Sequence, residues 1–319
     1  MSSIELSVII PAYNAGQTIG RCLDSLLQSV QQAPVEVICI DDGSKDNTWD
    51  ILQSYSKKYA CLRIFHKENG GVGSARNVGL FQAVGNYIAW VDSDDYVTTD
   101  WYAMIHSRLA KYSPDCLVFD YFYTKNDVDK PRHINLPEKV NLDDFIYEES
   151  LERELKNFLV IRVIRAELLK MVTFNESYHM LEDYDVLTQV TPKFKKIIHI
   201  NKCLYYYVQN ESSLTHNVSS EIRWNNIDVV QRRYNRYKKL GFSVSINDCV
   251  ICLVEYLYQN KRDRIKESER NASVRKKLRI HKDRILRDKG IGKRVKVKAI
   301  CAIMGMDRLL RVLLELKNK

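Results

Sequence analysis

The stretch Leu6-Ser-Val-Ile-Ile10, which stops at Pro11, begins an alternation of strand-like and helix-like patterns that continues to about residue 125. Short runs of β-branched residues of this kind are typical of buried strands. Three similar runs follow, with helical spacing of apolar residues between them: Val35–Ile40, Leu62–Phe65 and Tyr87–Val91. This order predicts an α/β fold with a mostly parallel, doubly wound, Rossmann-like sheet covered by helices on both faces.

Acidic, aromatic and glycine residues occur where these predicted strands end. They are Tyr13, Asp42, the loop Asn69–Gly73 and the segment Asp92–Asp95. In open α/β sheets, ligands bind outside the carboxyl ends of the strands. The pattern therefore predicts a ligand site at this edge of the sheet.

The rest of the chain predicts a second half of the sheet domain and a helical appendage. Residues 126–141 are polar and predict a loop, residues 142–170 and 182–190 predict helices, and residues 197–208 predict a strand or hairpin. From residue 219 onward the apolar spacing is helical. For 319 residues, at about 150 per domain, we expect a domain over 1–217, divided near residue 125, and a helical, basic region over 218–319.

Composition excludes several classes of protein. With 45% hydrophobic and 28% charged residues, the chain is neither disordered nor collagen-like. No apolar run approaches the roughly 18 residues of a membrane span, and the N-terminus lacks the pattern of a signal peptide, so we expect a cytoplasmic location. The eight cysteines are scattered, and the C-x-x-C motif Cys249-Val-Ile-Cys252 has no second ligand pair. Reduced, buried thiols are therefore expected rather than a zinc site.

Positive charge is concentrated at the C-terminus. The net charge is +9, but residues 270–319 contribute +13, so residues 1–269 carry −4. This distribution favours a local anionic partner over nucleic acid. An apolar stripe over residues 300–316 lies beside Arg308 and Arg311, which is typical of an interfacial helix on anionic lipid. The alternative is a helix packed on the domain or on a homodimer partner.

The segment Asp92-Ser93-Asp94 is a D-x-D at the end of a predicted buried strand, with Asp95 behind it. Carboxylates this close repel one another unless a cation lies among them. Hard oxygen ligands suit Mg²⁺ or Mn²⁺, which leave positions open for phosphate oxygens. The alternative is an acidic turn that caps the following helix.

Two further segments at this edge have both a binding and a turn interpretation. Asp42, in Asp41-Asp-Gly-Ser44, could accept a hydrogen bond from a base or a ribose, and Tyr13 offers a ring for stacking; Asp-Gly-Ser also favours turns. The loop that starts at Asn69 lacks the third glycine of the dinucleotide fingerprint and the Gly-Lys of a P-loop. It still allows backbone and Arg76 to approach a ligand, or forms a tight strand–helix turn.

Glu182 and Asp183 begin a predicted helix beyond the first half of the sheet, with Asp185 two residues later. A carboxylate there could act as a general base. Acidic residues are also favoured in the first turn of a helix by the helix dipole, and the spacing does not separate these two interpretations.

Taken together, four ordered segments resemble the family 2 glycosyltransferases, an inverting group with the GT-A fold. They are Ser7-Val-Ile-Ile-Pro-Ala-Tyr-Asn14, Asp41-Asp-Gly-Ser-Lys-Asp-Asn-Thr48, Asn69-Gly-Gly-Val-Gly-Ser-Ala-Arg-Asn-Val-Gly79 and Trp90-Val-Asp-Ser-Asp-Asp95. The resemblance is strong over about residues 5–110, weaker over 180–216, and absent beyond about 220.

The resemblance implies roles for individual residues. Pro11, Tyr13 and Asp42 correspond to residues that hold the nucleotide base and ribose. Asp92 and Asp94 correspond to the D-x-D that engages the ribose and the metal–diphosphate, with Asp94 as the metal ligand, and Asp183 corresponds to the catalytic base. The other residues expected to bind the nucleotide sugar are Asn69, Arg76 and Ser93. One departure is Leu181, which stands where a glycine often precedes the acidic pair.

We therefore expect a Mn²⁺- or Mg²⁺-dependent glycosyltransferase. It would move a sugar from a nucleotide donor, most simply a UDP-sugar, to a glycan or lipid-linked acceptor in cell-surface polysaccharide synthesis, with peripheral attachment to the inner face of the membrane. One alternative is a sugar-1-phosphate nucleotidyltransferase, although its glycine- and arginine-rich N-terminal loop is missing. The other is a non-catalytic protein that binds nucleotide sugars or glycans.

Overall fold

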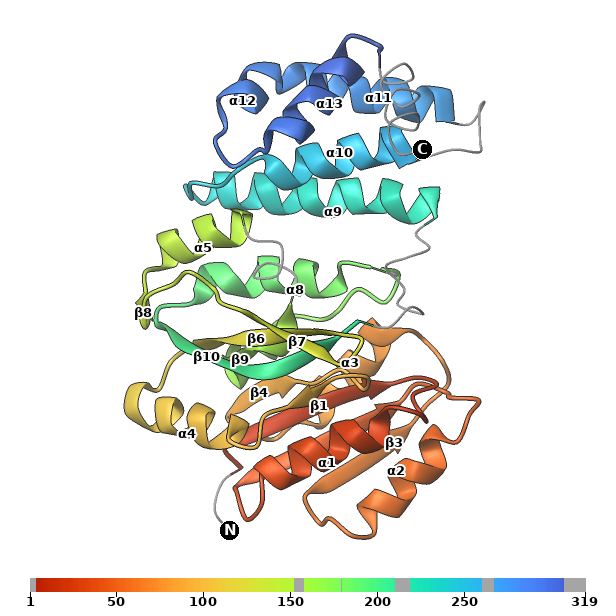
Figure 1. Ribbon diagram of the computed structural model, residues 1–319, viewed down its shortest axis with the longest axis vertical. Helices are drawn as coiled ribbons and strands as arrows, with labels where there is room; N and C mark the ends of the chain where they lie inside the picture. Colours follow the sequence, from red (N-terminus) through yellow and green to blue (C-terminus); the bar gives the residue numbers. More distant parts are fainter. Residues whose placement is uncertain (1–3, 152–157, 179, 210–218, 260–266, 307–319) are drawn as a thin grey trace. The chain divides into compact units, whose positions relative to one another are not determined.

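The structure is a computed structural model that describes residues 4–306, apart from 152–157, 179, 210–218 and 260–266 (Figure 1). The chain divides into two compact units. Unit 1 comprises Met1–Phe145 and Glu154–Ser213, and unit 2 comprises Ile146–Arg153 and Leu214–Lys319.

Unit 1 is built on one mixed sheet, to which ten strands of the described residues contribute. Their order is β3-β2-β1-β4-β9-β6-β10-β5, with β7 paired to β6 and β8 paired to β10. The strands are β1 (Leu6–Ala12), β2 (Val35–Asp41), β3 (Leu62–His66), β4 (Tyr87–Trp90), β5 (Tyr96–Val97), β6 (Cys116–Lys125), β7 (Val128–Arg132), β8 (Lys139–Val140), β9 (Arg162–Arg165) and β10 (Ile197–Val208).

The first half of the sheet is the predicted doubly wound α/β unit. Strand β1 pairs in parallel with β2 and β4, and β2 pairs in parallel with β3. All seven residues of β1 and all seven of β2 are buried, as expected for strands with helices on both faces. The connecting helices are α1 (Ile19–Ser29), α2 (Thr48–Ser56) and α3 (Val72–Gln82). The fold class expected from the sequence is confirmed.

The second half of the sheet is mixed. Strand β9 runs antiparallel to both β4 and β6, and β6 runs parallel to β10. The prediction of helical structure over 142–170 was therefore wrong in part, because β9 lies within this range. Its four residues, Arg-Val-Ile-Arg, are too few to show a period. The predicted loop over 126–141 likewise contains β7 and β8, whose polar residues gave no strand signal.

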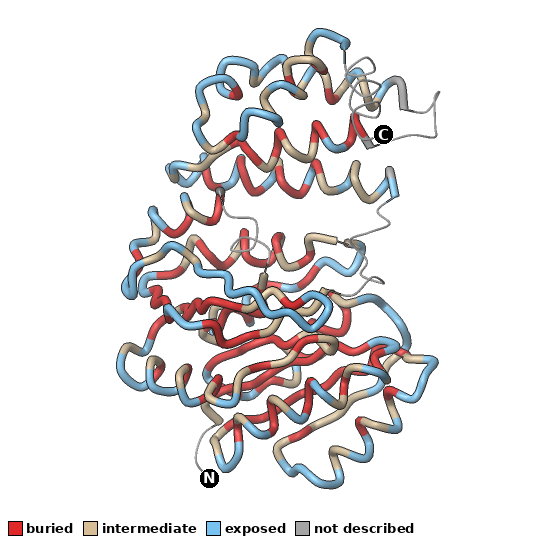
Figure 2. The backbone as a smooth tube through the Cα atoms, in the orientation of Figure 1, coloured by how far each residue is buried: buried red, intermediate tan, exposed pale blue. Residues whose placement is uncertain are grey.

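The other elements of unit 1 complete its outer layers. They are α4 (Trp101–Tyr112), the first residues of α5 (Leu142–Leu151), the 3-10 turns η1 (Leu159–Ile161) and η2 (Thr191–Lys193), α7 (Ala166–Leu169) and α8 (Glu182–Val190). The buried strands form the core of the unit, and the helices show their exposed faces outward (Figure 2). The predicted helix over 182–190 is confirmed.

Unit 2 is helical throughout its described part. Its helices are the end of α5, α9 (Ser220–Lys239), α10 (Asn247–Gln259), α11 (Glu267–Ile280), α12 (Lys282–Arg287) and α13 (Lys293–Ile303). A buried ion pair between Arg233 and Glu149, 2.6 Å apart, lies within it. Cys249 is buried and Cys252 half-buried on α10, and neither forms a disulfide. No helix among the described residues has the length and apolar character needed to span a membrane.

Candidate active site

The loops that follow β1 and β2 are tied to each other at the carboxyl edge of the sheet. The amide of Asn14 donates to Ser44 Oγ (2.9 Å), and the amide of Lys45 donates to Asn14 Oδ1 (2.8 Å). Between strand and loop, Pro11 is buried beside Ile40 while the Tyr13 side chain is 50% exposed. The Tyr13 ring is therefore accessible to a planar ligand.

Asp42 organises the glycine-rich loop. Its carboxylate accepts hydrogen bonds from the amides of Gly70 (3.0 Å) and Gly71 (2.8 Å) and forms an ion pair with Lys67 (2.6 Å). Asp42 is almost fully buried, whereas Asn69 is exposed. The loop approaches Gly43 so closely that a Cβ there would lie 2.8 Å from the Asn69 amide nitrogen, and Gly43 has φ +74°. Only glycine fits this turn without strain.

The acidic segment after β4 separates into accessible and buried carboxylates. Asp92, Ser93 and Asp94 are partly exposed, whereas Asp95 is buried. The Tyr205 hydroxyl donates to Asp95 Oδ2 (2.6 Å), and the Val208 amide donates to Asp95 Oδ1 (2.7 Å). Burial, followed by the charges of Asp94 and Asp92, raises the pKa of Asp95 well above its ordinary value. The buried Asp95 carboxylate is therefore hydrogen-bonded to β10, whereas Asp92 and Asp94 remain partly exposed after the end of β4.

Arg76 joins the D-x-D to the acidic pair of α8. Its Nη1 donates to Glu182 Oε1 (2.5 Å) and its Nη2 donates to Asp92 Oδ1 (3.2 Å). The Arg76 side chain is 6% exposed, and the Asp92 and Glu182 carboxylates hold its pKa above the ordinary value against the opposing effect of burial. Two motifs separated by about 90 residues in sequence are thereby brought to one place.

Asp183 lies next to this cluster at the start of α8. Its Oδ1 accepts a hydrogen bond from the Tyr184 amide (2.7 Å). Burial and the adjacent Glu182 charge raise the pKa of Asp183 to about 8, while Arg76 acts in the opposite direction. A carboxyl group with a pKa in this range can take up and release a proton near neutral pH.

Leu181 adopts a left-handed backbone, φ +63° and ψ +23°, immediately before the acidic pair. This conformation is unfavourable for a residue with a Cβ and favours glycine. The turn before Glu182 and Asp183 therefore forms with leucine at position 181, although glycine would adopt the same backbone conformation without strain.

The D-x-D has the donor set for a hard divalent cation. Asp92 and Asp94 offer carboxylate oxygens, and the side chain of Asp92 is 32% exposed. In the described part of the chain, no group of three ligand side chains forms at this segment; the three that do come together are Asp120, His133 and Cys203, elsewhere in the sheet. A cation here would take its remaining ligands from water and substrate oxygens, as Mg²⁺ and Mn²⁺ commonly do.

The structure thus places the predicted site residues in two adjoining groups. Pro11, Tyr13, Asp42 and Asn69 lie at or after the ends of β1–β3, and Arg76, Asp92 and Asp183 lie around the start of α8. Sequence reasoning did not identify Lys67, which pairs with Asp42. It noted Tyr205 only within the weaker resemblance over 180–216 and gave it no role; the Tyr205 hydroxyl also accepts from the Asp92 amide (3.1 Å). The only signal for Tyr205 was the run of three tyrosines at 205–207.

This fold, with a D-x-D and a second acidic pair near the carboxyl ends of the strands, is that of the GT-A glycosyltransferases. Residues 7–169 match the model of the family "Glycosyl transferase family 2", and the chain belongs to this family.

Proteins of known sequence and structure resemble the chain over much of its length. Glycosyltransferase GlyG of Streptococcus pneumoniae is 28% identical over 77% of this chain and 81% of its own length. Chondroitin synthase of Pasteurella multocida is 28% identical over 98% of this chain and 30% of its own length. The chain spans 35% of S. pneumoniae glycosyltransferase GlyA and 62% of Bacillus subtilis EpsJ.

The fold is shared with a solved structure. Staphylococcus aureus TarS, residues 1–349, in complex with UDP-GlcNAc, superposes with a TM-score of 0.67 over 96% of this chain and 89% of that one, at 22% identity.

Proposed function

We propose that the chain transfers a sugar from a UDP donor to a hydroxyl of a glycan or lipid-linked acceptor by a single displacement that inverts the anomeric centre, with Asp183 as the catalytic base. The observation that carries this proposal is the cluster of Asp183, Glu182, Arg76 and Asp92 around one point at the sheet edge. A non-catalytic binding protein would not need a carboxyl group tuned toward neutral pH at that point.

The proposed reaction assigns distinct tasks to the two acids of α8. Asp183 takes the proton of the acceptor hydroxyl, which is otherwise a poor nucleophile. Glu182 is buried and paired with Arg76, so we assign it the role of positioning the guanidinium. Arg76 in turn favours the ionised form of Asp183, which is the form that acts as a base. The oxygen of the acceptor then attacks the sugar from the face opposite the departing diphosphate.

The donor is proposed to lie along the edge from Tyr13 to Asp94. The exposed ring of Tyr13 would stack on the base, and Pro11 would line the strand below it. Asp42 would contribute by fixing the loop at Asn69 and, with its remaining acceptor capacity, by binding the base or ribose. Ser93 and Asp92 would contact the ribose and diphosphate. TarS in complex with UDP-GlcNAc supports a UDP-linked hexose or N-acetylhexosamine.

The proposed cofactor is Mn²⁺ or Mg²⁺, held by Asp94 with Asp92 beside it. When bound, the ion offsets the negative charge that develops on the leaving diphosphate. GalNAc-T7, solved with UDP, GalNAc and Mn²⁺, resembles this chain with a TM-score of 0.52 over 72% of this chain and 48% of its own. Its Mn²⁺ supports the proposal of such an ion.

The acceptor is proposed to be a growing polysaccharide or a lipid-linked saccharide. Among the relatives, chondroitin synthase and hyaluronan synthase are named for polysaccharides, poly(ribitol-phosphate) beta-glucosyltransferase for a polymer, and cholesterol galactosyltransferase for a lipid. The domain limits expected from the sequence, 1–217 and 218–319, remain proposals for how the transferase and the helical region are separated.

We also propose a cytoplasmic location with residues 270–319 at an anionic membrane surface. In the described part of this tail, large apolar side chains are exposed among the basic residues: Ile280, Leu286, Val297, Met304 and Met306. Arg308, Arg311 and the rest of the apolar stripe from residue 307 onward lie outside the described residues. The alternative is that this surface contacts a second copy of the chain.

A screen for UDP release tests the proposed reaction. The full chain is incubated with a panel of UDP-sugars and a saccharide acceptor, with Mn²⁺, with Mg²⁺, or with a chelator. We expect one or two donors to release UDP in a metal- and acceptor-dependent manner, with an inverted product linkage. A nucleotidyltransferase would instead release pyrophosphate from a nucleoside triphosphate, and a binding protein would release neither.

A further inference from the structure

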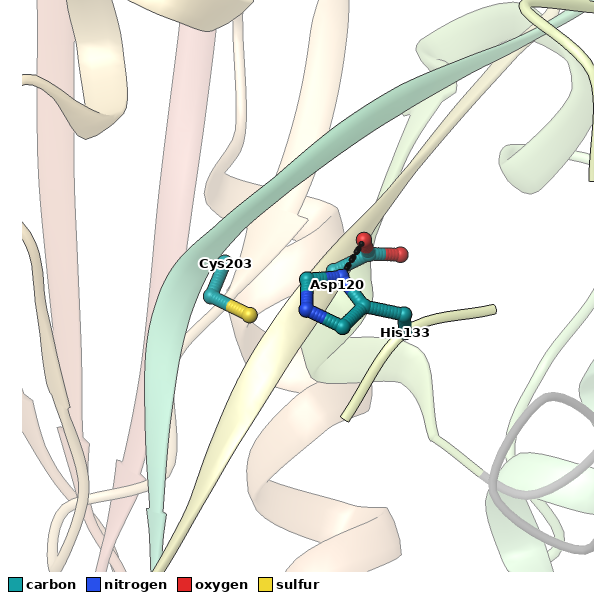
Figure 3. A group of neighbouring side chains, drawn as sticks. All are labelled: Asp120, His133 and Cys203. Carbon is teal, nitrogen blue, oxygen red and sulfur yellow. Dashed lines mark hydrogen bonds and ion pairs between the residues drawn. The ribbon is translucent and has the colours of Figure 1, made fainter. Parts of the chain in front are cut away.

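A second cluster of ligand side chains lies inside the sheet of unit 1, away from the acidic edge. Asp120 on β6, His133 just after β7 and Cys203 on β10 each place one ligand atom within 4.8 Å of those of the other two. Figure 3 shows the three side chains together, with the imidazole of His133 hydrogen-bonded to the Asp120 carboxylate. These residues come from separate parts of the sequence, so the sequence pattern alone gave no sign of the cluster.

A bulge in β10 produces this juxtaposition. His199 and Ile200 pair in register with Val118 and Phe119, but the next pairing joins Cys203, not Asn201, to Asp120. Asn201 and Lys202 are exposed and leave the ladder. Bulges commonly redirect a side chain at a functional site. Without this one, an asparagine would face Asp120 in place of the thiol.

Asp120 is held in position by two groups outside the cluster. His199 Nε2 and the Ile134 amide lie 2.8 Å and 3.0 Å from its Oδ1. Within the cluster, His133 Nδ1 lies 2.7 Å from Asp120 Oδ2. His199 is itself buried and fixed by the Leu136 carbonyl, 2.9 Å from its Nδ1. Ligating carboxylates are typically hydrogen-bonded in this manner by neighbouring groups.

The cluster is also accessible and adjustable on one side. Asp120 and Cys203 are buried, but the side chain of His133 is 60% exposed. Ligands of a tetrahedral zinc ion lie about 3.6 Å apart. Ligand atoms within 4.8 Å of one another need shifts of about 1 Å to reach that spacing, and His133 lies on an exposed segment after β7.

We propose that Asp120, His133 and Cys203 form a binding site for Zn²⁺ or a similar thiophilic divalent ion, with the fourth position open to water. A thiolate and an imidazole select such ions, whereas the carboxylates of Asp92 and Asp94 suit Mg²⁺ and Mn²⁺. The chain would therefore carry two chemically distinct cation sites. The zinc site does not depend on the proposed transferase reaction.

Cobalt substitution tests the site directly, because a thiolate bound to Co²⁺ gives a charge-transfer absorption band that oxygen ligands do not. The full chain is freed of metal with a chelator, desalted, and titrated with Co²⁺ and then with Zn²⁺. We expect the band to saturate at one Co²⁺ per chain and to disappear when Zn²⁺ displaces the cobalt. Cys203→Ser should abolish the band, and His133→Gln should weaken Zn²⁺ binding at least about tenfold.

Matched controls separate this site from others in the chain. Cys61→Ser changes a half-buried thiol of unit 1 that lies outside the cluster. His106→Gln removes an exposed imidazole whose Nδ1 lies 2.8 Å from Glu5, a contact like that of His133 but without a cysteine in the group. Both variants, and Asp94→Asn, should keep the band. Absence of the band in the unchanged chain, its persistence in Cys203→Ser, or unchanged affinity in His133→Gln would overturn the proposal.

Discussion

Arg76 Nη1 lies 2.5 Å from Glu182 Oε1, although the two residues are 106 positions apart in the chain. The contact joins α3, the helix that follows the glycine-rich loop, to the start of α8. Since Arg76 also contacts Asp92, it connects the loop, the D-x-D and the acidic pair. The position of the proposed base thus depends on one buried guanidinium.

Replacement of Arg76 by glutamine should destabilise unit 1 strongly. Glu182, 8% exposed, would remain as a buried charge without its partner, and loss of one member of such a pair costs about 3–5 kcal/mol. Urea denaturation measures the change in the free energy of unfolding. Glu182→Gln in the same background should recover part of the loss, and a double-mutant cycle would show this coupling.

Arg108→Gln is the matched control for that variant. Arg108 Nε lies 3.6 Å from Glu138 Oε1, and the Glu138 side chain is 49% exposed. Solvent screens such a pair, so its loss should cost about 0–1 kcal/mol. Equal losses for the two arginine variants would show that Arg76 has no special role.

Transfer should become faster as the pH rises through about 8. The ionised form of Asp183 is the base, and burial with the Glu182 charge raises its pKa to about 8. Below that value kcat/KM should increase about tenfold per pH unit, and above it the profile should level off. A profile that is flat from about pH 6 to about pH 9 would exclude Asp183 as the titrating base.

Stability should change with pH in the opposite direction. Between the ordinary pKa of an aspartate and about 8, folded Asp183 binds more protons than the unfolded chain does, so the free energy of unfolding falls as pH rises through this window. Asp183→Asn removes this dependence. The free energy of unfolding of the variant, minus that of the unchanged chain, should therefore increase with pH. Denaturation at several pH values measures this difference.

Leu181→Gly should preserve both folding and activity. The left-handed backbone at Leu181 costs a residue with a Cβ about 1–2 kcal/mol, which offsets the greater chain entropy that glycine brings to the unfolded state. Leu181→Val, whose β-branched side chain tolerates this conformation poorly, should lose about 1–2 kcal/mol and reduce kcat by misplacing Asp183. Thermal unfolding and kinetic assays on the two variants distinguish these outcomes; equal behaviour would show that the turn is unstrained.

The basic tail should bind vesicles that contain anionic lipid and release them at high salt. A variant in which Ile280, Val297 and Met304 are all changed to serine should bind the vesicles more weakly in a flotation assay, because its exposed apolar side chains are lost. Phe81→Ser with Val84→Ser changes exposed apolar residues of unit 1 and serves as the control. Undiminished flotation of the tail variant, or none by the unchanged chain, would end the membrane proposal.

Local patterns predicted the first half of the fold well and the second half less well. Strands β1, β2 and β4 consist mostly of apolar residues and are buried at every position, so consecutive residues predict their burial on both faces. Strand β3 is only partly buried. Strand β9 has four residues and β7 is polar and wholly exposed, so both depend on their neighbours in the sheet rather than on their own sequence.

The same distinction applies to the site residues. Motif positions such as Asp42 and Asp92 could be named from the strand ends, but their partners could not. Lys67, Tyr205 and the Arg76–Glu182 pair follow from the three-dimensional arrangement of distant segments. The zinc cluster is the extreme case, because a two-residue bulge decides which β10 side chain faces Asp120.

Asp183→Asn, assayed for both transfer and donor binding, tests the central claim most directly. The amide keeps the size of the side chain but cannot accept the proton of the acceptor. We expect kcat to fall by about 10²–10⁴, while Mn²⁺-dependent affinity for the UDP-sugar, measured by calorimetry, stays within about threefold, a difference of less than 1 kcal/mol. Retained transfer, or a parallel loss of transfer and donor binding, would contradict the assignment of Asp183 as the base.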